Sequence, residues 1–214
     1  MRRSVKVTDV ASPEMIAEIY QGPKPRQPLI SWFTVAGWKE RYQRIIGEIK
    51  NLYALARCTK DIKGFSMRTF KTDVLELYKK INEHFAAGEL TLLRRQTTGQ
   101  CFGLMKRELK ARDKANWGKV SWGLAEEPRL SDLELVQGRM LALDPNNPKT
   151  HFVQMTVKFS TKHKFAAYDR KGKLVAGKPE EVFPVQEFWV LERPLANPEG
   201  RWLLAARLTL NTDR

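Results

Sequence analysis

The first half of the chain has the apolar spacing of amphipathic helices. Apolar residues recur at steps of three and four over residues 38–58, 66–87 and 98–115. Gly88 follows the second stretch, at the position where a glycine commonly ends a helix. Residues 89–96 fit a short helix only ambiguously. The pattern therefore predicts three helices, with these apolar residues: Tyr42, Ile45, Ile46, Ile49, Leu52, Tyr53 and Ala56; Phe70, Val74, Leu77, Tyr78, Ile81 and Phe85; Cys101, Leu104, Met105 and Leu109.

The second half of the chain changes to the alternating pattern of β-strands. Turn-forming residues separate the alternating stretches at 144–148, 169–172 and 194–200. Helices followed by an antiparallel meander indicate the α+β class, not alternating α/β. Four tryptophans in this half, at 117, 122, 189 and 202, are expected in the core. Strands are expected over residues 117–122, 133–143, 152–165, 173–176, 182–191 and 202–210.

The N-terminal segment carries few helix or strand signals. Prolines restrict residues 22–28 to extended or turn conformations, because each proline also restricts the residue before it. We expect an arm that lies over a surface, or is flexible when alone. Leu29, Ile30, Trp32 and Phe33 form an apolar group that should dock. The predicted division is an extended arm at 1–36, a helix and linker at 37–64, and an α+β domain at 65–214.

Charge adds a functional expectation. The 214 residues include 38 Lys and Arg against 24 Asp and Glu, a net charge of +14, which favours RNA, DNA or anionic lipid headgroups as partners. The aromatic residues do not form a base-stacking platform, so contacts to the RNA backbone are expected. No apolar run is long enough to span a bilayer. The candidate residues for binding RNA or lipid headgroups form three clusters: Lys106, Arg107, Lys110, Arg112 and Lys114, with Lys119 beyond them; Lys158, Lys162 and Lys164; and Arg170, Lys171 and Lys173.

Motifs for catalysis or for metal binding are missing from the sequence. Cys58 and Cys101 are far apart and lie on apolar stripes, and the histidines lack the spacing of a helical metal pair. His163, between two lysines, is expected to be neutral or to face a phosphate. No nucleophile elbow or phosphate-binding glycine loop occurs. We therefore expect no catalytic residues, no metal and no cofactor, and predict that the protein is not an enzyme.

The end of the chain resembles a known family. Residues 188–202 (FWVLERPLANPEGRW), together with residues 152–165 and the basic hairpin after them, resemble the Tim-forty-four-like (Tim44-like) domain over about residues 65–210. The match is closest to the branch that contains a mitochondrial large-subunit ribosomal protein and the fungal inner-membrane mitoribosome receptor. Residues 28–37 are similar to the receptor branch as well.

This resemblance implies both a fold and a role. The fold is a cystatin-like cone, in which N-terminal helices pack on a curved antiparallel β-sheet and leave an apolar pocket. The role is non-catalytic: it holds the mitoribosome near its tunnel exit against the inner membrane, on the matrix side and peripherally. The implied partners are rRNA and proteins near the tunnel exit, anionic inner-membrane lipids and the membrane insertase, with no small-molecule substrate. Two alternatives remain open, an adaptor of the import-motor scaffold and a binder of a lipid or small ligand in the pocket.

Overall fold

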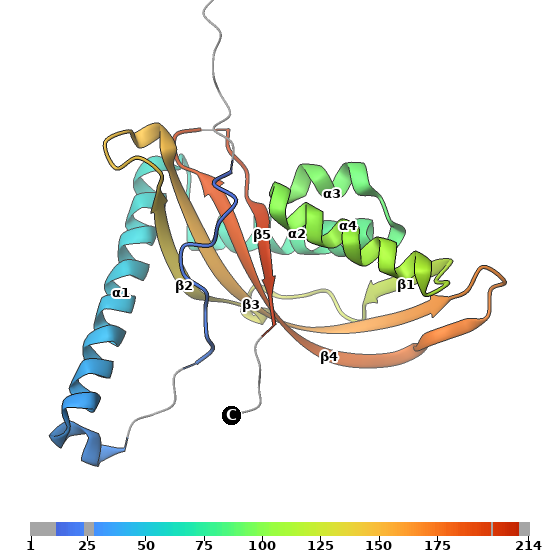
Figure 1. The fold of residues 1–214 in the computed structure, drawn as a ribbon, viewed down its shortest axis with the longest axis horizontal. Helices are drawn as coiled ribbons and strands as arrows, with labels where there is room; N and C mark the ends of the chain where they lie inside the picture. Colours follow the sequence, from blue (N-terminus) through green and yellow to red (C-terminus); the bar gives the residue numbers. More distant parts are fainter. Residues whose placement is uncertain (1–11, 24–27, 198, 210–214) are drawn as a thin grey trace, which may run out of the picture.

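The predicted order of helices followed by strands is confirmed by a computed structural model, which describes residues 12–23, 28–197 and 199–209 (Figure 1). Ser66 caps the second helix by accepting a hydrogen bond from the Thr69 N–H, and Gly88 ends it with a φ of 75°. The ambiguous stretch at 89–96 forms a helix. The elements are a 3-10 helix at Leu29–Phe33, α1 (Val35–Asp61), α2 (Met67–Ala87), α3 (Leu90–Gln96), α4 (Gly99–Lys114), β1 (Lys119–Leu124), β2 (Leu133–Ala142), β3 (His151–Tyr168), β4 (Leu174–Pro194) and β5 (Leu203–Leu208).

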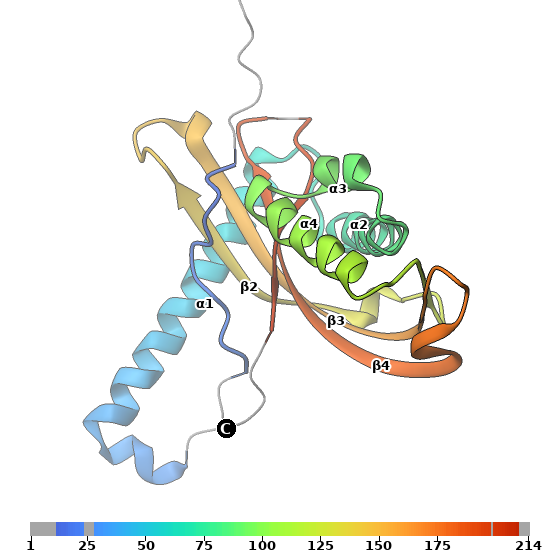
Figure 2. The ribbon, with the colours of Figure 1, turned by 45° about the vertical axis from the view of Figure 1, so that its right-hand side comes forward.

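The five strands form one antiparallel sheet. The long strand β3 pairs with β2 along its first half and with β1 along its second half, while β4 pairs with β3 and β5 with β4. The register shifts at two places between β3 and β4, and once more between β4 and β5. Such shifts bend a sheet. As a result, β3 and β4 sweep in an arc, and α2, α3 and α4 cover its inner face (Figures 1 and 2).

The prediction of separate strands at 173–176 and 182–191 is wrong, because β4 is continuous across both. Phe165 pairs with Lys178 and Lys164 with Val182, so residues 179–181 form a bulge on β4. β5 pairs only with residues 188–192, which leaves this part of β4 at the edge of the sheet. An edge strand tolerates proline, because one row of its N–H groups needs no partner in the sheet. The proline-containing segment is therefore a bulge and not a connection.

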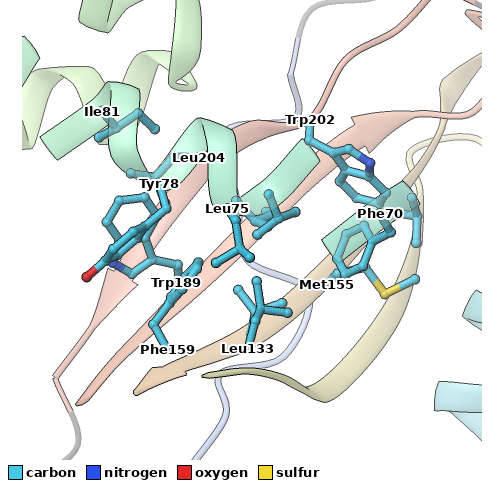
Figure 3. Close-up of a cluster of buried hydrophobic side chains, with 14 of the residues drawn as sticks. Phe70, Leu75, Tyr78, Ile81, Leu133, Met155, Phe159, Trp189, Trp202 and Leu204 are labelled. Carbon is cyan, nitrogen blue, oxygen red and sulfur yellow. The ribbon is translucent and has the colours of Figure 1, made fainter. Parts of the chain in front are cut away.

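The core lies between α2 and the inner face of the sheet (Figure 3). The ring of Tyr78 stacks on Phe159 with centroids 4.1 Å apart and lies 4.7 Å from the ring of Trp189. Nearer the start of α2, Phe70 meets Trp202 edge-on at 4.9 Å. Trp189 and Trp202 are buried as predicted, whereas the tryptophans at 117 and 122 are only half-buried. Both cysteines are buried free thiols, as expected.

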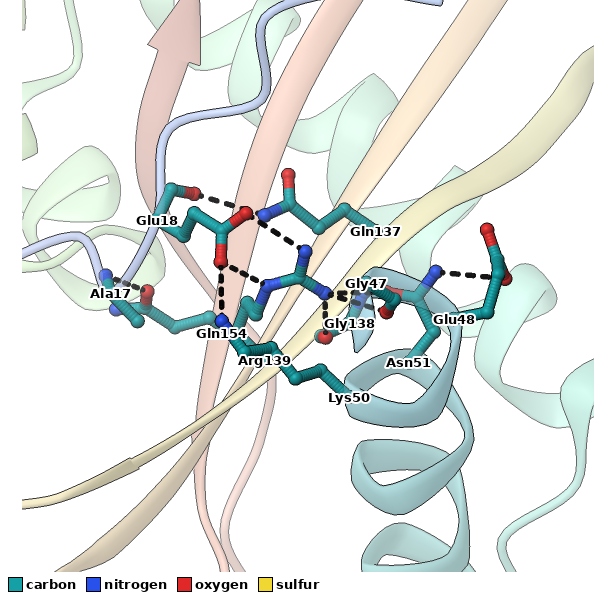
Figure 4. Close-up of polar contacts among 10 residues, drawn as sticks. All are labelled: Ala17, Glu18, Gly47, Glu48, Lys50, Asn51, Gln137, Gly138, Arg139 and Gln154. Atoms are coloured by element: carbon teal, nitrogen blue, oxygen red, sulfur yellow. Dashed lines mark hydrogen bonds and ion pairs between the residues drawn. The ribbon is translucent and has the colours of Figure 1, made fainter. Parts of the chain in front are cut away.

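The described part of the arm, residues 12–23, lies over the other face of the sheet. The Gln154 side chain accepts from the Ala17 N–H at 2.8 Å and donates to the Met15 carbonyl at 2.7 Å. Arg139 donates to Glu18 at 2.7 Å and to Asn51 of α1 at 2.6 Å, so one guanidinium joins the arm, β2 and α1 (Figure 4). The prediction that the arm lies over a surface is confirmed for these residues. Residues 1–11 and 24–27 of the predicted arm lie outside the described part of the chain.

The side chains of the apolar group at 29–33 that the structure describes are not docked in the core, so the docking of this group stays a prediction. Ile30 is 76% exposed and Phe33 is 92% exposed, and Trp32 is also exposed. The Leu29 side chain lies outside the described atoms. Most of the large apolar residues along α1 also face outward, although Leu55 is half-buried against the core, and only Gly37, Ala54 and Cys58 of this helix are fully buried. α1 therefore packs through Ala54, Cys58 and Leu55, with Asn51 hydrogen-bonded to β2, and leaves most of its apolar stripe uncovered.

Candidate nucleic-acid interface

Four of the five predicted basic residues of α4 are exposed on this helix. Lys106, Arg107, Lys110 and Lys114 all face solvent, and helical spacing sets the three lysines one turn apart. Glu108, an acidic residue of the same helix, forms an ion pair with Arg207 of β5 at 2.6 Å. The exposed side of α4 therefore carries a row of positive charges.

The fold brings the third cluster, at the β3–β4 hairpin, next to the end of α4. The chain leaves α4 along this hairpin, where the Trp117 ring lies 5.9 Å from Phe165 and the Gly118 N–H donates to the Tyr168 carbonyl at 2.8 Å. A Cβ atom at Gly118 would meet the backbone of Arg170 at 2.9 Å, so a glycine permits this close approach. Figure 1 shows the end of α4 and the hairpin at the same end of the molecule. We call the following residues the basic end: Lys106, Arg107, Lys110, Lys114, Lys119, Arg170, Lys171 and Lys173.

The hairpin presents its cations on an ordered turn. One carboxylate oxygen of Asp169 accepts from the Lys171 N–H at 2.8 Å and from the Lys173 N–H at 2.9 Å. Gly172, with a φ of 80°, completes the turn. Arg170, Lys171 and Lys173 are exposed. The Asp169 carboxylate is therefore hydrogen-bonded to the backbone of the turn. The three cationic side chains project from this ordered turn.

Arg112 differs from its neighbours in α4. Its guanidinium lies 4.0 Å from the centroid of the Phe85 ring and donates to the Phe85 carbonyl at 2.9 Å. Burial lowers the pKa of Arg112. These contacts hold α4 on the end of α2, which is a structural role. A cleft of about 220 Å³ lies beside it, lined by Lys106, Lys110 and Trp117 among others.

The second cluster lies on a different surface. Along β3, Phe159, Thr161 and His163 are buried, whereas Lys162 and Lys164 are exposed and Lys158 is half-buried, as the alternating spacing predicts. Lys162 pairs with Glu126 at 2.8 Å. Lys158 lines a pocket of about 770 Å³ with residues that include Tyr20 and Phe188. The structure therefore brings the first and third clusters together and places Lys162 and Lys164 on the outer face of β3, whereas Lys158 lines its pocket together with Leu104 and other residues of α4.

A buried polar network between α2 and the sheet is absent from the sequence predictions. The Tyr78 hydroxyl donates to Glu187 at 2.7 Å and contacts His163 Nε2 at 2.8 Å, and Trp122 Nε1 donates to His163 Nδ1 at 3.3 Å. Because Nδ1 accepts from Trp122, His163 is neutral and its Nε2–H donates towards Tyr78 or Thr161. Burial lowers the pKa of His163 and raises the pKa of Glu187.

The origin of these residues explains why the sequence did not predict the network. Its residues come from α2, β1, β3 and β4, at positions with no common spacing, so no local pattern indicates them. The expected neutral His163 is confirmed, and its side chain is buried in the network instead of facing a phosphate. A pocket of about 450 Å³ lies beside the network, lined partly by Trp122, Phe183 and Phe85.

Residues 12–23, 28–197 and 199–209 show neither a metal-binding cluster nor a helix that could cross a membrane. Among these residues, no group of three or more His, Cys, Asp or Glu is placed to hold a metal ion. None of the helices within the same ranges is long and apolar enough to cross a membrane.

Comparison with known proteins identifies similar sequences. Residues 53–208 match the family model of the Tim44-like domain. Large ribosomal subunit protein mL45 of Drosophila melanogaster is 26% identical over 174 residues, which cover 81% of this chain and 45% of that protein. The mL45 proteins of Bos taurus and Caenorhabditis elegans are 24% and 26% identical, covering 84% and 67% of this chain and 55% and 38% of their own lengths. The chain spans about half the length of the first two relatives.

Proposed function

The chain belongs to the Tim44-like domain family, and from this premise we propose that it is a non-catalytic component of the mitochondrial large ribosomal subunit. The observation that carries the proposal is the similarity to mL45, which covers 81% of the chain for one relative and 84% for another. In this proposal the basic end contacts rRNA. Its cations gather on one surface without a base-reading platform, which suits contacts to phosphate groups along an RNA backbone.

We also propose that the protein tethers the ribosome to the inner membrane. It would lie on the matrix side, peripheral to the bilayer, and hold the tunnel exit where emerging hydrophobic chains meet the insertase. The net charge of +14 supports attraction to anionic headgroups as well as to RNA. Lys162 and Lys164 are exposed on the outer face of β3, so lipid contact at these two lysines is compatible with RNA contact at the basic end.

Co-sedimentation with purified mitochondrial large subunits over a salt series tests the proposal that the chain binds the large subunit through its basic end. We expect saturable binding that weakens as salt rises, with a log–log slope of about −0.7 to −0.9 for each phosphate contact. The variant Lys106→Glu/Lys110→Glu/Lys114→Glu should bind more weakly. Because it loses up to three phosphate contacts, the magnitude of its log–log salt slope should be smaller by about 2 to 3. The control Lys60→Glu/Lys63→Glu/Lys149→Glu makes the same charge change on exposed lysines elsewhere and should bind like the parent chain. Equal loss in both variants would show that net charge, and not the basic end, determines binding.

Anionic liposomes in a parallel assay test the tether. The tether is supported if association with the liposomes falls as salt rises. It is also supported if Lys162→Glu/Lys164→Glu weakens this association more than the charge reversal of Lys106, Lys110 and Lys114 does. Binding to neither subunits nor liposomes would favour the adaptor of the import motor.

The pocket beside Tyr78 favours one second candidate, a binder of a lipid or small ligand. Mass spectrometry of the protein under native conditions would detect a retained ligand. A ligand lost in a Phe183→Trp variant, which narrows the pocket, would support that candidate.

A further inference from the structure

The cleft of about 220 Å³ beside Arg112 lies within the basic end, between the end of α2, α4 and the start of β1. Trp117, which precedes β1, forms part of its wall. Neither Lys106 nor Lys110 forms an ion pair with a described residue. The cleft is therefore a cationic recess with an aromatic residue in its wall. Its charged lining residues are Lys106, Lys110, Arg112 and Asp113.

Trp117 is held in place on the protein side. Its N–H donates to the Arg112 carbonyl at 3.0 Å, and its ring packs on Phe165 of β3 with centroids 5.9 Å apart. The side chain nevertheless stays half-buried, so part of it remains accessible. A nucleobase stacks on an aromatic side chain whatever its sequence, because every base has a π-face. A fixed tryptophan in a cationic recess is therefore suited to hold one base.

The end of α2 adds backbone acceptors to the cleft. The last four carbonyl groups of a helix have no partner within it. In α2 the carbonyls of His84 and Phe85 accept from the N–H groups of the two residues that follow the helix, at 2.9 and 3.4 Å. The carbonyls of Ala86 and Ala87 accept no hydrogen bond from a described residue, and both residues line the cleft. Two acceptors therefore stay available beside the cations.

This combination of groups favours a nucleotide over other anionic ligands. Lysines without an acidic partner suit phosphate groups. Carbonyl oxygens and the Asp113 carboxylate repel a phosphate, but they accept hydrogen bonds from the amino group of a base. A free phosphate or the phosphate of a lipid would use the lysines alone. A nucleotide uses the lysines, the aromatic ring and the acceptors together.

We propose that this cleft receives one unstacked nucleotide of an RNA. The base stacks on Trp117, and its exocyclic amino group donates to the carbonyls at the end of α2. Lys106 and Lys110 contact the phosphates on either side of the base. Bulges and loops of RNA present such unstacked bases. The inference rests on the proposed contact between the basic end and rRNA, and adds a site for a single amino-bearing base to contacts that otherwise involve the RNA backbone.

Three labelled RNA hairpins with the same stem test this proposal. They differ at one bulged position, which is adenosine, uridine or an abasic site, and fluorescence anisotropy measures their binding to the full chain. We expect the adenosine hairpin to bind about 5- to 150-fold more tightly than the abasic one, because stacking of the base on an aromatic ring contributes this much. The uridine hairpin, whose base has no amino group, should bind about 2- to 10-fold more weakly than the adenosine hairpin.

Three variants assign the effect to the cleft. Trp117→Leu should abolish the preference for adenosine over the abasic site and leave binding of the abasic hairpin unchanged. Trp38→Leu, a matched change at an exposed tryptophan of α1, should keep the preference. Lys106→Ala/Lys110→Ala should weaken binding of both hairpins and reduce the magnitude of the log–log salt slope by about 1.4 to 1.8. Thermal melting confirms that the variants fold, and the comparison of hairpins with the parent chain needs no variant.

Equal binding of the adenosine and abasic hairpins to the parent chain would overturn the base site and leave the proposed backbone contacts intact. A preference for adenosine that persists in Trp117→Leu would overturn it as well. Equal binding of adenosine and uridine would overturn the hydrogen bonds to the α2 carbonyls. Binding of no hairpin, at a salt concentration where the large subunits co-sediment, would also overturn the inference. Failure of the proposed function appears separately, as loss of co-sedimentation with the large subunits.

Discussion

Replacing Tyr78 by phenylalanine removes one hydroxyl from the buried network and keeps the ring that packs on Phe159 and Trp189. The lost hydrogen bond, 2.7 Å long, stabilises the Glu187 carboxylate. A hydrogen bond to a charged group contributes about 1.5–3 kcal/mol, against about 0.5–1.5 kcal/mol between neutral groups. For a chain of this size, a loss of about 2 kcal/mol lowers the melting temperature by about 4–8 °C.

The pH dependence of this loss has a definite sign. Burial raises the pKa of Glu187, and the Tyr78 hydroxyl opposes that rise. The protonated form of such a carboxyl stabilises the fold fully below the pKa of an unfolded glutamate, about 4.3, and this contribution is lost as the pH rises through the raised pKa. Without the hydroxyl the pKa of Glu187 rises further. Tyr78→Phe should therefore destabilise the protein more at about pH 8 than at about pH 5.

Urea unfolding, followed by tryptophan fluorescence, measures the free energy of unfolding at each of the two pH values. Trp189 lies close enough to Tyr78 to report the unfolding of this region. Tyr42→Phe, the same change on an exposed residue, serves as the control and should change the free energy of unfolding by less than about 0.5 kcal/mol. An equal loss at both pH values would refute the assignment of Glu187 as the ionised partner. A loss as small as that of the control would refute the network itself.

Two further predictions concern the core and the arm. Trp202→Ala should lower the free energy of unfolding by about 3–5 kcal/mol, measured by urea unfolding, because it empties a buried site against Phe70. Arg139→Ala should release the arm, measured as faster proteolysis before Leu29. In the parent chain, Arg139 lowers the pKa of Glu18 to about 2, so the arm should loosen as the pH falls from about 4.3 towards that value. Resistance to proteolysis that stays unchanged in the variant, or across this pH range, would contradict the role of the ion pair.

The sequence predicted the elements well where one face of an element is buried by the fold. The stripe of Phe70, Tyr78 and Ile81 predicted α2, and the alternation along residues 152–165 predicted β3, because periodic burial leaves periodic apolar residues. The break predicted in β4 was wrong, since pairing with β3 carries the strand across the bulge at residues 179–181. The division into an arm at 1–36, a helix and linker at 37–64 and a domain at 65–214 stays a prediction.

By itself, the sequence determined the α+β order, the positive charge, the exposed cations of α4 and the hairpin, and the family resemblance, because each depends on composition or on local spacing. Tertiary structure alone decided that the two basic clusters join through Gly118 and that Arg112 packs on Phe85. It also decided that Tyr78, His163 and Glu187 meet, and that the apolar stripe of α1 faces solvent. Spacing along a helix shows that its apolar residues share one face. Which face meets the rest of the molecule depends on contacts such as those of Ala54 and Gly138, which lie far apart in the sequence.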